Sequence, residues 1–265
     1  MDHGGSGQPV LLLHGGLAHA RWWDFVVPHL GPGIHALALD LRGHGDSGWA
    51  PDGAYRIADY ARDVGRAIAA LGLERPALVG HSLGSFVALR YAVDHPRDLA
   101  AVVVVDGRAS FGESGSRYMK LLGMFWAVPY PTLEEAVARF QPLPKDTIAA
   151  PEVIAYVARH GFRCDGGRWT TKFDRASLGG HEPFDLKSRL GDLECPVLCV
   201  RGERSVVLRS QSAKALVAAC RAGTLVEVAG AYHHVLIDRP DVVGQEIGAF
   251  LRRAADRRID GDYNA

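Results

Sequence analysis

The sequence predicts a doubly wound α/β domain, with a mostly parallel sheet of about six strands and a helical insertion. Short apolar runs rich in Val, Leu and Ile recur along the chain, and helical patterns lie between several of them. Such runs are typical of strands that are covered on both faces, as the strands of a parallel sheet are. The runs are residues 10–13, 35–40, 77–79, 99–105, 197–201 and 224–228.

Three segments carry the 3.6-residue period of amphipathic helices. They lie after the second run, between the last two runs, and after Pro240 near the end of the chain. Strands that alternate with helices in this way favour an α/β fold. The apolar positions are Ile57, Tyr60, Ala61, Val64, Ile68 and Leu71, then Ala213, Leu216, Val217 and Cys220, then Ile247, Phe250 and Leu251.

The alternation of strands and helices stops between residues 108 and 186. This stretch shows helical spacing but no buried strand, and it is too long for a plain loop. We therefore expect a core domain made of residues 1–107 and 187–265, with residues 108–186 inserted as a helical cap or lid. Four basic residues of the insertion are expected on solvated faces, and no cluster for a phosphate or coenzyme A is apparent. These are Lys120, Arg139, Lys145 and Arg159.

Composition and charge exclude several classes of protein. The 265 residues include 30 Lys and Arg and 30 Asp and Glu, so the chain lacks the basic balance of a nucleic-acid-binding protein. Its longest apolar run is far shorter than the roughly 20 residues of a membrane-spanning helix. The first residues lack the basic and apolar regions of a signal peptide, and the cysteines lack metal-ligand spacing. We expect a reduced, cytoplasmic protein that binds a small molecule rather than nucleic acid or a membrane.

The segment from Ala77 to Leu89 carries the clearest chemical signal. It contains Gly80-His81-Ser82-Leu83-Gly84, a Gly-x-Ser-x-Gly motif, between an apolar strand and an apolar helix. These flanks are the ones that a nucleophile elbow requires, since the serine sits on a sharp turn from strand to helix. Glycine at both ends of the motif leaves room for that turn. Ser82 is therefore the candidate nucleophile.

With this motif the sequence resembles the α/β-hydrolase superfamily, of the capped type with a serine nucleophile. Further matches occur in the family's order, from about Val10 to Leu251. His14-Gly15-Gly16 follows the first strand as the family's oxyanion loop does, and Asp40 to Ser47 is similar to the loop after the next strand. Gly230-Ala231-Tyr232-His233-His234 follows the last strand, where the family places its catalytic histidine.

The resemblance implies acyl transfer through a serine ester, without a cofactor or a metal. Ser82 would attack an acyl carbon, and His233 would remove its proton and later deliver it to the leaving group. His234 is the alternative base, although His233 fits the family pattern better. The backbone amides of Gly16 and Leu83 would stabilise the oxyanion.

The acid of the triad departs from the family pattern. The family usually places an Asp after the seventh strand, and Val206 stands near that position. Asp106 follows the strand at 99–105, a place where some members of the superfamily carry their acid. We favour Asp106 as the acid, with Glu203 as the alternative and a site without an acid as the third reading.

The N-terminus departs from the family pattern as well. The family fold usually opens with two antiparallel strands, whereas about nine residues precede Val10. We therefore expect the first of these strands, and most of the second, to be missing. The sheet edge is then either open to pairing with a second copy in a homodimer or left uncovered.

The insertion and the oxyanion loop supply apolar side chains for a substrate pocket. We expect this pocket to favour an uncharged, partly hydrophobic group. A small ester or lactone is the predicted substrate. The alternatives are a C–C hydrolase, lyase or acyltransferase on the same fold, or a ligand-binding relative without hydrolytic activity. The candidate pocket residues are Leu17, Trp22, Phe111, Met119, Leu122, Phe125 and Trp126.

Overall fold

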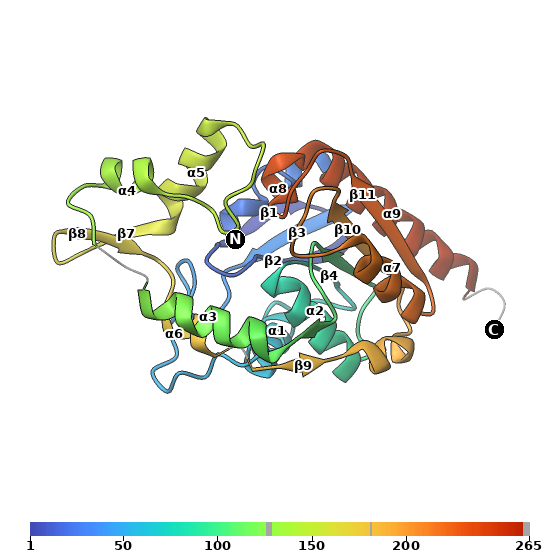
Figure 1. Ribbon diagram of the computed structural model, residues 1–265. Helices are drawn as coiled ribbons and strands as arrows, with labels where there is room; N and C mark the ends of the chain where they lie inside the picture. Colours follow the sequence, from blue (N-terminus) through green and yellow to red (C-terminus); the bar gives the residue numbers. More distant parts are fainter. Residues whose placement is uncertain (126–128, 181, 262–265) are drawn as a thin grey trace.

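The computed structural model describes residues 1–125, 129–180 and 182–261, and its centre is a seven-stranded sheet (Figure 1). The strand order is β1-β3-β2-β4-β5-β10-β11, and every neighbouring pair is parallel except β1 and β3. The strands are β1 (Asp2–Gly5), β2 (Gln8–Leu13), β3 (Ile34–Leu39), β4 (Ala77–His81), β5 (Ala101–Val105), β10 (Val197–Gly202) and β11 (Gly223–Val228).

Helices cover both faces of the sheet, which explains the continuous apolar runs of the strands. Alternate residues of one strand point to opposite faces, so that Leu11 packs in one core cluster and Leu12 in the other. One face is covered by α1 (Ile57–Ala70), α2 (Leu83–Asp94) and α7 (Ser210–Ala219). The other face is covered by η1 (Ala20–Trp23), η2 (Val27–His29), α8 (Val235–Asp238) and α9 (Pro240–Gly261).

The first strand corrects the expectation for the N-terminus. β1 pairs antiparallel with β3, with Asp2 opposite Leu37, and the amino group of Met1 donates to the Ala38 carbonyl. The sheet therefore has the six parallel strands that the sequence predicts and one short antiparallel strand besides, which covers the β3 edge. The Asp-His-Gly-Gly sequence of β1 gives no apolar signal because the strand is short and mostly exposed.

The chain between β5 and β10 forms a separate group of short elements, which Figure 1 shows beside and below the sheet. The β6–β9 pair, with Phe111 opposite Phe184, brings the two ends of this insertion side by side. The helices of the insertion agree with the predicted helical spacing. Its short strands were not predicted because they lack the apolar runs that indicate a strand. The elements are β6 (Ser110–Phe111), α3 (Glu113–Phe125), α4 (Leu133–Arg139), α5 (Pro151–Gly161), β7 (Phe162–Asp165), β8 (Arg168–Thr171), α6 (Ala176–Gly179), β9 (Phe184–Asp185) and η3 (Lys187–Asp192).

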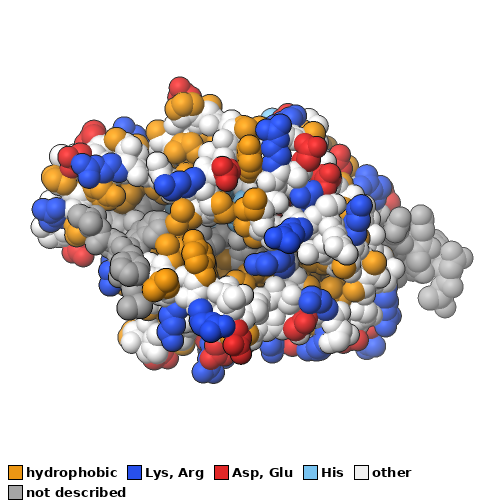
Figure 2. All heavy atoms as spheres, viewed as in Figure 1, with side chains coloured by type: hydrophobic (Ala, Val, Ile, Leu, Met, Phe, Trp, Pro, Cys, Tyr) orange, Lys and Arg blue, Asp and Glu red, His pale blue; other side chains and the backbone are white. Residues whose placement is uncertain are grey.

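The surface carries charges of both signs, and apolar side chains gather between the insertion and the core on the face shown in Figure 2. In the described part of the chain, no helix combines the length and the apolar character that a membrane crossing requires.

Candidate active site

Ser82 lies at the sharp turn between β4 and α2. Its φ angle of 49° is in the left-handed region, which a serine rarely adopts, and its amide donates to the Val105 carbonyl at 3.0 Å. A Cβ on Gly80 would lie 2.1 Å from the Gly84 carbonyl oxygen, and one on Gly84 would lie 2.2 Å from the Leu13 carbonyl oxygen. Only glycine fits these two positions, so the motif residues allow the strained turn that presents Ser82.

Asp106 follows β5 directly and is completely buried. Its Oδ2 accepts hydrogen bonds from His233 Nδ1 at 2.7 Å and from Ser205 Oγ at 2.5 Å, and its Oδ1 accepts one from the Gly202 amide at 3.0 Å. Three donors therefore compensate the carboxylate for its lost hydration. Asp106 is thus held against the imidazole of His233, where a triad acid has to lie.

The alternative acid, Glu203, lies elsewhere. Its Oε2 accepts the amide hydrogen of Gly230 at 2.7 Å, which fixes the turn before the histidine loop, and no hydrogen bond or ion pair between Glu203 and His233 occurs among the described residues. Val206, at the family's usual acid position, is 67% exposed. Of the two candidate acids, Asp106 is therefore the one in contact with His233.

The buried environment sets the protonation of this pair. Burial raises the pKa of the Asp106 carboxyl to about 6, although the hydrogen bonds from Ser205 and Gly202 oppose the shift. Burial lowers the pKa of the His233 imidazole to about 3, and the positive charge of Arg108 acts in the same direction. At neutral pH the pair is therefore an ionised carboxylate and a neutral imidazole. Because Nδ1–H donates to Asp106, the lone pair is on Nε2, as a general base requires.

The two other histidines near His233 are held by backbone carbonyls. His81 Nε2 donates to the carbonyl of His233 at 3.0 Å, and His234 Nε2 donates to the carbonyl of Pro144 at 2.8 Å. His81 thus fixes the histidine loop from the elbow, and His234 ties that loop to the insertion. His234 has no hydrogen bond to Asp106 within the described chain, so its contacts are not those of the triad base.

One ring nitrogen from each of His81, His233 and His234 lies within 4.8 Å of those of the other two. The sequence spacing gave no sign of this set because the fold joins positions 152 residues apart. Imidazole nitrogens are suitable ligands for divalent transition-metal ions of intermediate softness, so these three histidines could hold one such ion. A metal bound there would compete for the nitrogen of His233 that proton transfer needs.

Ser82 and His233 open into one pocket of about 300 Å³. The Ser82 hydroxyl makes no hydrogen bond to another described residue. Hydrogen bonds between a nucleophile and its base often tighten only in the substrate complex. Of the candidate pocket residues, five line this space together with Gly16 and Leu83. The side chain of Phe125 and the whole of Trp126 lie outside the described residues. The five are Leu17, Trp22, Phe111, Met119 and Leu122.

The two candidate oxyanion residues lie side by side in this pocket, since a Cβ on Gly16 would be 4.0 Å from Leu83 Cβ. Neither backbone amide donates a hydrogen bond to another described residue. Leu83 is also the first residue of α2, where amides are left without helical partners. Both amides thus lack a competing partner among the described residues, which is a requirement for oxyanion donors.

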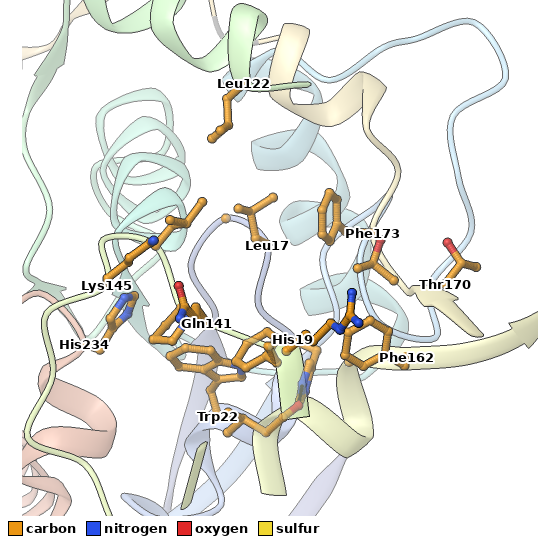
Figure 3. A pocket seen from close by; sticks show the side chains of 18 of the residues that line it. Leu17, His19, Trp22, Leu122, Gln141, Lys145, Phe162, Thr170, Phe173 and His234 are labelled. Atoms are coloured by element: carbon orange, nitrogen blue, oxygen red, sulfur yellow. Dashed lines mark hydrogen bonds between the residues drawn. The ribbon is translucent and has the colours of Figure 1, made fainter. Parts of the chain in front are cut away.

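A second cavity of about 450 Å³ adjoins the first beneath the insertion (Figure 3). The two cavities share several lining residues, among them Leu17, Trp22 and Leu122, so they are neighbours with a common wall. Phe162 and Phe173 form apolar walls of the second cavity, and its polar side chains include those of Gln141 and Thr170.

Sequence reasoning missed two residues that matter at this site. Ser205 donates to the carboxylate of Asp106, and Arg108 lines the catalytic pocket two residues after Asp106. Ser205 lies in the loop after β10, the loop in which the family usually carries the acid. This position in the sequence is the one signal that could have identified Ser205. Arg108 had no signal because a lone arginine beside a predicted insertion is usually a surface residue.

Comparison with known proteins identifies the family of this chain. The sequence profile described as "alpha/beta hydrolase fold" matches residues 8–240 of the chain. The chain belongs to the α/β-hydrolase family. This agrees with the sheet order, the elbow and the order of the motifs, and it confirms the resemblance and the fold class that the sequence indicated.

Similar proteins of this family are hydrolases. The chain is 31% identical over 247 residues to esterase Rv0045c from Mycobacterium tuberculosis, covering 89% of this chain and 80% of the relative. A crystal structure of that esterase has a TM-score of 0.78 and 26% identity over 95% of this chain and 86% of that one. A putative carbamate hydrolase, RutD from Variovorax paradoxus, is 32% identical over 198 residues, 73% of this chain and 72% of the relative. The chain is accordingly a hydrolase of the ester-hydrolase type.

Proposed function

We propose that the protein is a serine hydrolase that acts through an acyl-enzyme on a small, partly hydrophobic ester or lactone. The observation that supports this most strongly is the hydrogen bond from His233 Nδ1 to buried Asp106, in the pocket that also holds Ser82. The similarity to an esterase and to a putative carbamate hydrolase supports the same reaction class.

In the first half of the reaction, Ser82 Oγ attacks the acyl carbon and its proton passes to His233 Nε2. Asp106 stabilises the imidazolium that forms, and the amides of Gly16 and Leu83 donate to the oxyanion. The C–O bond to the alcohol then breaks, and His233 returns the proton to the leaving oxygen. This leaves the acyl group as an ester on Ser82.

In the second half, water takes the place of the alcohol. His233 removes a proton from the water, whose oxygen attacks the acyl carbon of the Ser82 ester. The bond to Ser82 Oγ breaks and the serine regains its proton from His233, which releases a carboxylic acid. A lactone follows the same steps, with the leaving alcohol still attached to the product.

We also propose that residues 108–186 act as a cap over a core of residues 1–107 and 187–265. Leu122 from α3 and Pro144 from the loop after α4 line the pocket above Ser82. Part of the pocket wall thus comes from the insertion, as expected of an element that sets access and substrate choice. We place the reaction in the cytoplasm, with a small molecule as the partner.

The test is product analysis with 4-nitrophenyl butyrate and a panel of lactones, using wild-type protein and the His233→Ala variant. A burst of 4-nitrophenol together with a mass increase of one butyryl group on Ser82 supports the acyl-enzyme. Butyl butyrate formed in large excess over butyric acid at a low butanol concentration would instead favour an acyltransferase, since a hydrolase transfers its acyl group mainly to water. If wild-type protein binds one of these esters or lactones tightly but forms no product from it, the proposal is contradicted and a non-hydrolytic relative is favoured.

A further inference from the structure

The two neighbouring cavities near Ser82 have an unbalanced charge. Their described lining includes Arg108 in the catalytic pocket and Arg139 and Lys145 in the adjoining cavity, but no Asp or Glu. The whole chain, by contrast, has 30 basic and 30 acidic side chains. The two cavities are therefore cationic within a protein of zero formal net charge.

Arg108 has no acidic partner among the described residues. Its Nε is buried and lacks a hydrogen-bond partner, whereas Arg42 pairs with Asp63 at 2.5 Å. Arg108 follows Asp106 in the loop after β5, and its charge acts on His233. A guanidinium that is partly removed from water and has no acceptor for its N–H groups costs free energy, unless a ligand supplies the missing acceptor.

Arg139 and Lys145 give the adjoining cavity the same character. Arg139 is the last residue of α4, and Lys145 lies in the loop that follows. Neither makes an ion pair or a hydrogen bond to another described residue, and both line the cavity. Figure 3 shows the Lys145 side chain at the edge of this cavity, near Gln141 and His234. Both side chains are exposed, as the sequence predicted, and they also line a substrate-sized cavity.

From these observations, and resting on the proposed function, we infer that the substrate carries a carboxylate, which Arg108 binds while the scissile acyl group lies at Ser82. The planar guanidinium suits a carboxylate because it can donate two parallel N–H bonds. Phe111 and Leu122 line the space beside it and suit a short carbon chain. Arg139 and Lys145 accommodate a longer or second anionic end of the substrate.

The experiment compares two esters with the same leaving group, mono(4-nitrophenyl) adipate and 4-nitrophenyl hexanoate. We expect wild-type kcat/KM to be about ten- to a hundredfold higher for the adipate ester, because hydrogen bonds to charged groups are strong. Arg108→Met should reduce this ratio to near one, and Arg108→Lys should retain part of it. Arg97→Met, which removes an exposed arginine paired with Glu194, is the matched control and should keep the full ratio.

Calorimetric titration of the protein with adipate separates this inference from the proposed function. If neither ester is turned over, the proposed function fails, but adipate binding to wild type that is lost in Arg108→Met still supports the carboxylate site. A wild-type ratio near one without adipate binding would overturn the inference. A ratio unchanged in Arg108→Met would overturn the role of Arg108.

Discussion

The core holds Asp106 completely buried by three hydrogen bonds, whereas the insertion presents Arg139 and Lys145 to an open cavity without an ion pair to another described residue. In α3, Tyr118 is 62% exposed and Leu121 is 54% exposed. A fixed geometry suits the reaction step, because proton transfer needs donors and acceptors in place before the substrate arrives. A cavity wall whose charged side chains have no fixed partners is suited to substrate selection, because these side chains can contact ligands of different length.

The largest effect is expected from removing the nucleophile. Ser82→Ala should lower kcat for ester hydrolysis by about 10⁵-fold or more, for anionic and neutral esters alike, because no acyl-enzyme can form. The measurement is steady-state hydrolysis, with circular dichroism to show that the variant is folded. A residual rate within tenfold of wild type would mean that the core does not carry the chemistry.

The next largest effect tests the acid. Asp106→Asn should lower kcat by about 10⁴-fold, because an amide cannot fix the Nδ1–H tautomer of His233 or stabilise its imidazolium. The matched control is Glu203→Gln, which removes the alternative acid. It should retain activity within about threefold, since Glu203 contacts Gly230 rather than His233. The reverse pattern would show that Glu203 is the acid.

The pH dependence of kcat/KM should follow the core pair rather than the insertion. Catalysis needs Asp106 ionised and His233 neutral, and burial raises the pKa of Asp106 to about 6. Activity should therefore be constant above this pH and fall about tenfold per unit below it, because protonation removes the carboxylate. A neutral ester measured between pH 4 and 8 gives the profile. A rate that holds down to pH 4 would contradict the assigned protonation.

The smallest effect is expected in the insertion. The double substitution of Arg139→Met and Lys145→Met should lower kcat/KM for the adipate ester by about two- to fivefold, since exposed charge pairs contribute little. The effect on the hexanoate ester should be smaller. A loss of several hundredfold for both esters would show that the insertion takes part in the chemistry rather than in the choice of substrate.

The sequence predicted the parts of the molecule whose signal is local. The buried strands appeared as apolar runs, and the elbow appeared as a motif with its flanks, because both depend on neighbours along the chain. The contact of Asp106 with His233 was implied by the resemblance to the α/β-hydrolase superfamily, in which some members carry their acid after this strand.

The parts that the sequence missed depend on contacts between distant segments. Ser205 meets Asp106 only because β10 pairs with β5. Arg108, Arg139 and Lys145 line two neighbouring cavities only because the insertion folds back over the elbow. The short β1 strand had no apolar pattern because it lies at the exposed edge.

The most direct test of the central claim, that His233 and Asp106 activate Ser82, is intact mass after incubation with a fluorophosphonate. We expect a single adduct on wild-type protein, no adduct on Ser82→Ala, and much slower labelling of Asp106→Asn than of Glu203→Gln. A folded wild-type protein that gains no adduct, or an adduct that persists in Ser82→Ala, would contradict it.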